Sequence, residues 1–130
     1  MKKPFRVWFL AGALAASASV GLAAWHAHGL KSRLSAEAFE AFGRALHQQE
    51  FTAVGLMLLG LAGPSSRRRF GHLAGGVLLL GMILFCGSIY LSTAGGLEGA
   101  LRAAPAGGIA LILGWILLGW AGCRAAGEPG

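Results

Sequence analysis

The stretch Leu73–Thr93 decides the fold: it reads LAGGVLLLGMILFCGSIYLST and contains no Lys, Arg, His, Asp or Glu. As an α-helix with a rise of about 1.5 Å per residue it would measure roughly 32 Å, which matches the hydrocarbon thickness of a bilayer. A helix satisfies its own backbone hydrogen bonds, which lipid cannot do. The sequence therefore predicts a membrane-spanning helix over residues 71–93.

Three further apolar stretches flank this one and predict helices over 6–25, 45–63 and 105–123. None of them alternates with the period of two that the strands of a membrane β-barrel require. The predicted fold is therefore all-α. We expect a four-transmembrane-helix bundle with up-down topology, forming a single integral membrane domain over residues 1–130.

The composition also indicates a membrane protein. Of the 130 residues 55% are hydrophobic and 12% are charged, and the chain contains neither Asp nor Asn. These values exclude a disordered tail and an ordinary water-soluble enzyme. The net charge is +6, but Lys and Arg occur in short runs between apolar stretches, so we expect no nucleic-acid partner. Cys86 and Cys123 form no CxxC pair, which argues against a disulfide scaffold.

The first apolar stretch has an alternative interpretation as a secretory signal peptide. Basic residues precede it, and Ala16-Ser17-Ala18 resembles a cleavage site. The apolar run continues to Trp25, however, which is long for a signal peptide, and Trp suits an interfacial anchor. We therefore expect this segment to remain as the first membrane helix.

Lys and Arg are divided unequally between the two ends of the predicted bundle. Seven fall on one side, namely Lys2, Lys3, Arg6, Arg67, Arg68, Arg69 and Arg124. Four fall on the other side, namely Lys31, Arg33, Arg44 and Arg102. Because cytoplasmic segments carry the excess of positive charge, we expect both termini in the cytoplasm. The run of three Arg at 67–69 is then a topology signal that also attracts anionic lipid headgroups.

Residues 35–44 predict a short amphipathic helix that lies at the membrane interface before the second span. Ser35 is a candidate N-cap for it. Phe39, Phe42 and Leu46 share one face at spacings of three and four, and charged residues lie opposite.

Small residues recur where the helices would need to approach one another closely. A seven-residue spacing keeps such positions on one seam of a helix, and small side chains allow the close packing that holds helices together in lipid. We expect helix packing at Gly12, Ala74, Gly81, Ser88, Gly107, Gly114 and Ala121. The alternative is that a chain so rich in Gly and Ala produces these stripes by chance.

Three segments, in the same order along the chain, resemble the motifs of one known family. Ala27-His28-Gly29-Leu30-Lys31 resembles its Gly-Ala-His-Gly-Leu stretch, and Phe85-Cys86-Gly87-Ser88-Ile89-Tyr90-Leu91 resembles its Phe-Ser-Gly-Ser-Leu-Tyr motif. Pro105-Ala106-Gly107-Gly108, followed by Gly114-Trp115, resembles its Thr-Pro-x-Gly-Gly and Gly-Trp signature. On these motifs the chain is identified as a member of the domain-of-unknown-function 423 family, which is similar to eukaryotic transmembrane protein 256.

The resemblance implies a small multi-pass protein of the bacterial inner (plasma) membrane that has no assigned activity and no catalytic residues to transfer. The chain departs from the family pattern at three places. The family's Tyr-Gln-x-x-His in the second helix corresponds to His47-Gln48-Gln49-Glu50-Phe51, so Phe51 replaces the histidine. Ala104 stands where the family has Thr, and Cys86 stands where it has Ser. A function that depends on the second-helix histidine does not carry over to this chain.

Four ionisable residues are expected near the outer ends of the first two helices, namely His26, His28, His47 and Glu50. His47 and Glu50 share a helix face at i and i+3, and antiparallel packing would bring all four residues to one depth. Histidine together with a carboxylate can bind a metal ion or pass protons. The interpretation we favour is a polar network that ties the two helices together, without a cofactor.

A chain this small and apolar, in which no serine lies near a plausible base, predicts no enzyme. We expect a structural or accessory subunit, surrounded by the lipid bilayer, that docks onto a larger membrane complex or onto itself. The alternative is a small oligomeric transport or permeation protein. Against it, no predicted span carries a polar stripe along its full length.

Overall fold

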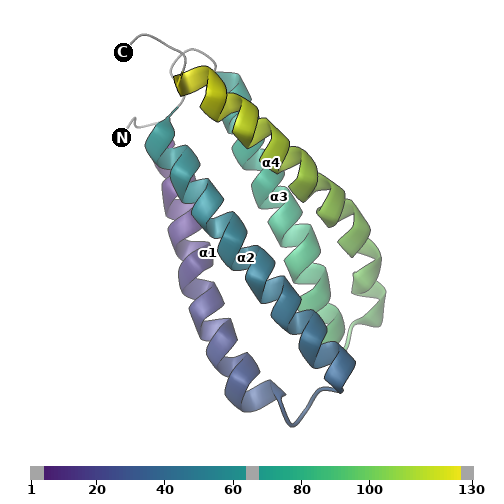
Figure 1. Ribbon diagram of the computed structural model, residues 1–130. Coiled ribbons are helices and arrows are strands. Elements are labelled where there is room, and N and C mark those ends of the chain that lie inside the picture. Colours follow the sequence, from purple (N-terminus) through teal and green to yellow (C-terminus); the bar gives the residue numbers. More distant parts are fainter. Residues whose placement is uncertain (1–4, 64–67, 127–130) are drawn as a thin grey trace.

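The structure, a computed structural model, describes residues 5–63 and 68–126, and all regular secondary structure in these residues is helical. The four long helices are α1 (Arg6–Trp25), α2 (Ala36–Ala62), α3 (Arg68–Thr93) and α4 (Ala104–Ala126). They lie side by side, and consecutive helices run in opposite directions (Figure 1). The first turn of α1 and the last turn of α4 therefore lie at the same end of the bundle. The predicted all-α fold is confirmed.

Two short helices lie at the other end of the bundle (Figure 1). A π-helical turn, η2 (His26–Leu30), extends α1, and a 3-10 helix, η3 (Glu98–Ala103), leads into α4. Gly29 allows the chain to pass close to the Trp25 ring, since an added Cβ would lie 2.6 Å from Trp25 Cδ1. We call this end, formed by η2, η3 and the first turn of α2, the η end.

The structure differs from the sequence prediction in the region of α2. A short interfacial helix over 35–44 and a separate span over 45–63 were expected, but α2 is one continuous helix of 27 residues. Neither Pro nor any other break separates the two parts. The predicted N-cap is present, because Ser35 Oγ accepts a hydrogen bond from the Ala38 backbone N–H at 3.2 Å. Gly63 ends the helix in a left-handed conformation with φ of 47°.

The first turns of α2 are amphipathic as a part of this longer helix. Phe42 and Leu46 are buried and pack with Leu30 of η2. Glu37 and Glu40 are exposed on the other side. The apolar face thus packs against the protein itself, which is why this segment continues straight into α2.

Within residues 5–63 and 68–126, three segments are long and apolar enough to cross a membrane, namely Arg6–Leu30, Arg69–Thr93 and Glu98–Arg124. α2 has the length of a span, but the polar run His47-Gln48-Gln49-Glu50 at its centre lowers its hydropathy. Of the four predicted spans, three therefore meet the criteria of length and composition.

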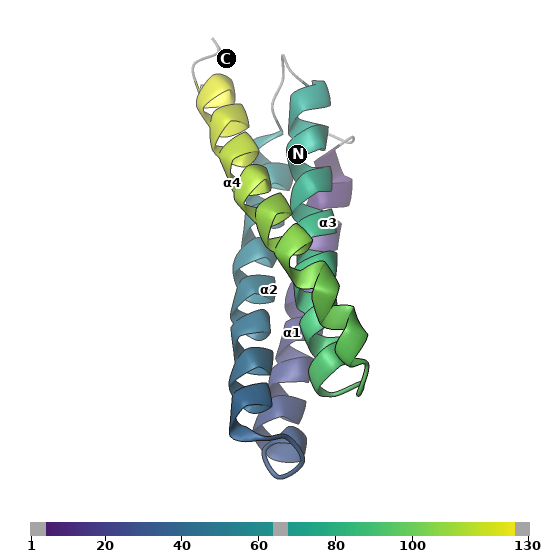
Figure 2. The same ribbon diagram turned by 90° about the vertical axis from the view of Figure 1, so that its right-hand side faces the viewer.

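The most extensive contacts join helices that are neighbours in the sequence, α1 with α2 and α3 with α4. The contact between α2 and α3 is smaller, and it joins two helical hairpins into one bundle. Figure 2 shows that α4 is inclined to the other three helices and runs at an angle across α3. As a result, α4 touches α2 over only a short length.

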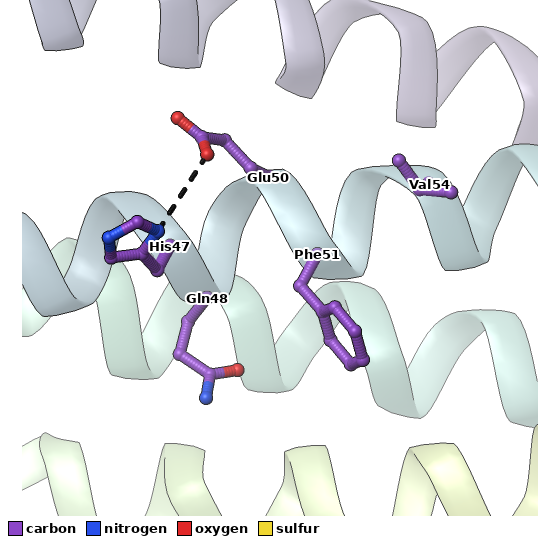
Figure 3. A pocket seen from close by; sticks show the side chains of 5 residues that line it. All are labelled: His47, Gln48, Glu50, Phe51 and Val54. Carbon is purple, nitrogen blue, oxygen red and sulfur yellow. Dashed lines mark ion pairs between the residues drawn. The ribbon is translucent and has the colours of Figure 1, made fainter.

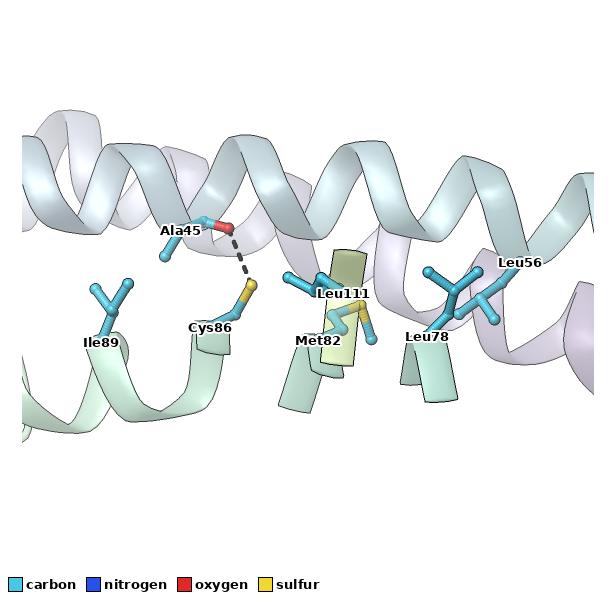
Figure 4. Packing of buried hydrophobic residues seen from close by; sticks show 7 residues of the cluster. All are labelled: Ala45, Leu56, Leu78, Met82, Cys86, Ile89 and Leu111. Atoms are coloured by element: carbon cyan, nitrogen blue, oxygen red, sulfur yellow. Dashed lines mark hydrogen bonds between the residues drawn. The ribbon is translucent and has the colours of Figure 1, made fainter. Parts of the chain in front are cut away.

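Most of the buried side chains between the two hairpins are apolar. These apolar side chains come from α2, α3 and α4, and they are Ala45, Leu56, Leu78, Met82, Cys86, Ile89 and Leu111 (Figure 4). The Cys86 thiol donates a hydrogen bond to the carbonyl oxygen of Ala45 at 3.2 Å. This contact satisfies the thiol inside the core.

Glycines lie where α3 and α4 approach one another. An added Cβ at Gly81 would lie 2.8 Å from the backbone nitrogen of Leu111. An added Cβ at Gly107 would overlap the backbone nitrogen of Phe85. Any side chain at these two positions would therefore push the helix backbones apart.

The other predicted packing positions are buried as well. An added Cβ at Gly114 would lie 3.0 Å from the backbone nitrogen of Leu78 on α3. Gly12 belongs to the first hairpin, where an added Cβ would lie 2.5 Å from the carbonyl oxygen of Ala53 on α2. At most 5% of the residue surface is exposed at Ala74, Ser88 and Ala121.

Candidate functional site

The centre of α2 carries the polar run from His47 to Glu50, and the helix turns its members to different sides. Only Gln49 faces the bundle, where it is buried. Its Nε2 donates a hydrogen bond to the carbonyl oxygen of Ala15 on α1 at 2.9 Å. Its Oε1 accepts a hydrogen bond from the Tyr90 hydroxyl on α3 at 2.6 Å. One amide thus connects three helices and has both of its ends satisfied.

The other three members of the run face outward. His47 Nδ1 lies 4.0 Å from Glu50 Oε2, with the side chains 85% and 48% exposed (Figure 3). With Gln48, Phe51 and Val54 they line an open hollow of about 550 Å³ on the outer surface of α2. We call His47, Gln48 and Glu50 the polar patch.

The polar patch lies level with the middle of α1. Gln49, which is next to Glu50, bonds to Ala15, and Ala15 is nine residues into α1. At about 1.5 Å per residue this is roughly 14 Å along the helix axis, or about half of a hydrocarbon core. The sequence prediction placed Glu50 nearer to the outer end of its helix, and the structure places it deeper.

No other long helix carries ionisable side chains of this kind in its middle. There is no Lys, Arg, His, Asp or Glu within 7–25, 73–93 or 104–123. The large exposed side chains on these segments, such as Leu14 on α1 and Leu80 on α3, are apolar. The polar patch is therefore the feature that distinguishes the outer surface of α2.

His26 and His28 lie apart from the polar patch, so the structure divides the predicted group of four. The His26 ring stacks on Phe39 with 3.9 Å between ring centroids, and it also stacks on Phe42. Its Nε2 donates a hydrogen bond to the carbonyl oxygen of Phe39 at 2.8 Å. His28 is exposed in η2.

The reason for this division is helix geometry. Phe42 and His47 are five residues apart, which corresponds to about 140° around a helix axis with 3.6 residues per turn. The face of α2 that His26 packs against therefore cannot also carry His47. The packing also places His26 level with Phe39, about two turns away from His47 along α2.

No three His, Cys, Asp or Glu side chains in the described part of the chain are placed to hold one metal ion. His47 and Glu50 alone would supply two ligands, whereas a zinc site takes at least three from the protein. A single copy of the chain thus offers no complete ligand set at the predicted residues.

Contacts at the end of the bundle opposite to the η end were not anticipated from the sequence. Trp8 Nε1 donates a hydrogen bond to His72 Nδ1 at 3.0 Å, and the Phe5 ring stacks on the same imidazole. Gly75 leaves room for the indole, since an added Cβ would lie 2.5 Å from the Trp8 ring. Gly75 belongs to the sequence Gly71-x-x-x-Gly75, a spacing that marks close helix approach and was the available signal.

Trp115 of α4 packs against α2. Its ring lies 4.7 Å from the Phe51 ring, measured between centroids, and it fills the space above Gly55. Phe51 is the residue that replaces the family histidine. The aromatic pair thus occupies the place where the motif would put an imidazole.

Of the three arginines predicted to mark topology, Arg67 lies outside the described residues. Arg68 begins α3, and the structure does not describe its side chain. Arg69 is exposed in the first turn of α3. The first turn of α3 lies at the same end of the bundle as the first turn of α1 (Figure 1).

Comparison with known proteins finds relatives over most of the chain. The model of a family described as "Protein of unknown function (DUF423)" matches residues 22–108. The UPF0382 membrane protein SERP0230 of Staphylococcus epidermidis is 33% identical over 124 residues, which are 94% of this chain and 99% of the relative. The UPF0382 membrane protein SH2409 of Staphylococcus haemolyticus is 30% identical over 87% of this chain and 92% of its own length.

A bacterium of another genus also has a similar protein. The UPF0382 membrane protein YwdK of Bacillus subtilis is 29% identical over 87% of this chain and 93% of its own length. No solved structure matches the chain. These relatives are membrane proteins by name, and their names state no activity.

Proposed function

We propose, for a chain that belongs to the DUF423 family of uncharacterised membrane proteins, a role as a structural or accessory subunit of a larger membrane assembly. In this role the protein has no catalytic activity of its own. It crosses the membrane four times, with α2 as the fourth span. In this role it binds another membrane polypeptide at its surface.

The packing of α2 supports its crossing. α2 lies alongside α1 from Phe39, which meets His26, to Gly60, which meets Phe9. Since α1 is apolar and long enough to span the membrane, a helix packed along its whole length must share its depth. The buried amide of Gln49, paired with α1 and α3, removes part of the cost of a polar run at that depth.

The polar patch is the observation that carries the proposal. An ionisable side chain at the bilayer centre costs about 2.5–3.5 kcal/mol on insertion scales, and such residues usually face protein or water instead of lipid. The His47 and Glu50 side chains are 85% and 48% exposed, and in the described part of the chain no hydrogen bond joins either of them to α1, α3 or α4. Another polypeptide that covers α2 would give these groups hydrogen-bond partners.

The protein resides in the inner (plasma) membrane of a bacterium with both termini in the cytoplasm. The end of the bundle that holds Arg69 and Arg124 faces the cytoplasm, because most of the Lys and Arg of the chain belong to that end. The η end then faces outward. The relatives named as membrane proteins of bacteria are consistent with this location.

Purification from native membranes tests the proposal. We expect the tagged protein, extracted in mild detergent, to bring down other membrane subunits at a fixed stoichiometry in native mass measurement. Replacing His47 and Glu50 by Leu should release them, whereas Leu14→Ala on the exposed face of α1 should not. Purification of this chain alone under all mild conditions would contradict the role. Ion flux through liposomes that contain only this chain would favour the transport alternative.

A further inference from the structure

We infer that the outer face of α2 is an interface between two copies of this chain, which pair through α2 in parallel. The inference deepens the proposed function and rests on the crossing of the membrane by α2. It names the first polypeptide that covers the polar patch: a second copy of the same protein.

The exposed residues of α2 have the spacing of a helix-pairing seam. We call this row the α2 seam, and it consists of Glu40, Arg44, His47, Phe51, Val54, Leu58 and Leu61. The separations alternate between four and three residues along its whole length. The four apolar members are each more than half exposed, at 62%, 54%, 56% and 58% in chain order. Such a spacing keeps one seam facing a partner helix in a left-handed pair.

This spacing would also suit a helix face in contact with lipid. The polar patch decides between a face that contacts lipid and a face that contacts another helix. His47 lies on the α2 seam, and Gln48 and Glu50 flank it on its two sides, since they are one and three residues further along the helix. Lipid tails leave all three without hydrogen-bond partners. A protein partner with both donors and acceptors at this depth satisfies them.

A second copy provides these partners at the required depth. Identical chains insert in the same orientation, so their two-fold axis is parallel to the membrane normal, and equal residues come to equal depth. The imidazole of one copy then meets the amide or carboxylate of the other. The patch is self-complementary in this arrangement, because it contains donors in His47 and Gln48 and acceptors in Gln48 and Glu50. Polar side chains of these types associate membrane helices by hydrogen bonding across the contact.

The other exposed surfaces lack this complementarity. Leu14 on α1, Leu80 on α3 and Ile112 on α4 are exposed among apolar neighbours, which are equally well solvated by lipid. High exposure of the α2 seam, reaching 85% at the His47 side chain, leaves it open to a second helix. α1 and α4 lie to either side of this face of α2 (Figure 3), and α4 touches it at Phe51, whose ring packs against Trp115 while the residue stays 62% exposed.

Disulfide cross-linking in native membranes tests the interface. In a Cys123→Ala background, Val54→Cys should form a covalent dimer on mild oxidation. Leu80→Cys is the matched control, because Leu80 is also 54% exposed but lies on α3. Cys86 can stay, since it is 3% exposed and bonded to Ala45. Equal cross-linking at both positions, or none at position 54, would overturn the α2 interface.

A second measurement uses the purified protein alone in lipid nanodiscs. We expect a native mass of two copies, and replacement of His47 and Glu50 by Leu should weaken the dimer by about tenfold. Glu50→Gln keeps a hydrogen-bonding group at this position, so this variant should retain most of the dimer affinity. A single copy per nanodisc would refute the dimer, and recovery of that copy with a different protein from native membranes would leave the proposed function standing. A monomer without any partner would refute both.

Discussion

Replacing Gly81 by Ala should destabilise the bundle by about 1–3 kcal/mol, although it adds a single methyl group. The methyl carbon would lie 2.8 Å from the backbone nitrogen of Leu111 and 3.1 Å from the carbonyl carbon of Ala110. Both of these atoms belong to the backbone of α4. They cannot turn away as a flexible side chain would.

The size of the effect follows from the displacement that is needed. Ordinary van der Waals contact begins near 3.4 Å, so α4 must move by about 0.6 Å to relieve the closest contact. A movement of this size separates the facing atoms along the α3–α4 contact and loses a fraction of their dispersion energy. Because the helices have no hydrophobic drive to associate in lipid, this packing energy is a main source of their affinity.

Gly76→Ala is the matched control, because Gly76 lies on the same helix and an added Cβ would have nothing within 4 Å. Ala favours a helix over Gly by about 0.5–1 kcal/mol in water, so this variant should be neutral or slightly stabilised. The two variants should differ by about 1–4 kcal/mol. Reversible unfolding in mixed micelles with increasing SDS, followed by tryptophan fluorescence, measures the difference. If both variants unfold at the wild-type midpoint, close contact at Gly81 does not stabilise the fold.

Two further predictions concern the hydrogen-bonded core and the topology. Tyr90→Phe and Gln49→Leu should each destabilise the bundle by about 0.6–2 kcal/mol in the same SDS titration. The double variant should lose less stability than the sum of the two, because both substitutions remove the same hydrogen bond. Strict additivity would show that the two side chains do not share this bond. In a chain without Cys123, Ser35→Cys should react with a membrane-impermeant maleimide in intact spheroplasts, whereas Arg69→Cys should react only after lysis. Labelling of both positions in intact cells would contradict the crossing by α2.

The sequence predicted α1, α3 and α4 well because a bilayer imposes a strong length and hydropathy requirement on a span, whereas α2, with its polar run, was wrongly divided into two helices. The seven-residue spacing of small residues marked positions such as Gly81 and Gly107, where α3 and α4 lie closest. Such spacing is readable because it depends only on residue size and helical period. The residue on the neighbouring helix that each small residue contacts depends on the tertiary structure, so the sequence alone did not identify it.

The polar residues could not be placed from the sequence with the same success. His26 turned out to stack on aromatic rings of α2, far from Glu50, because the register between two helices is set by all of their contacts together. The same register moved Glu50 to the level of Ala15. Tyr90 donates its hydroxyl to Gln49, a partner on another helix that the sequence could not identify. Depth and register are therefore what the structure adds.

The pairing of sequence neighbours into two hairpins has a consequence for biosynthesis. During translation the first hairpin can form before the third helix leaves the ribosome, because its contacts need only residues already made. In the proposed topology, the Gln49 amide can bond to Ala15 as the first hairpin forms, so that the most polar segment enters the bilayer already bonded to its neighbour. The second hairpin is apolar throughout its spans, so it can insert without a preformed polar contact and then pack as a unit against the first hairpin.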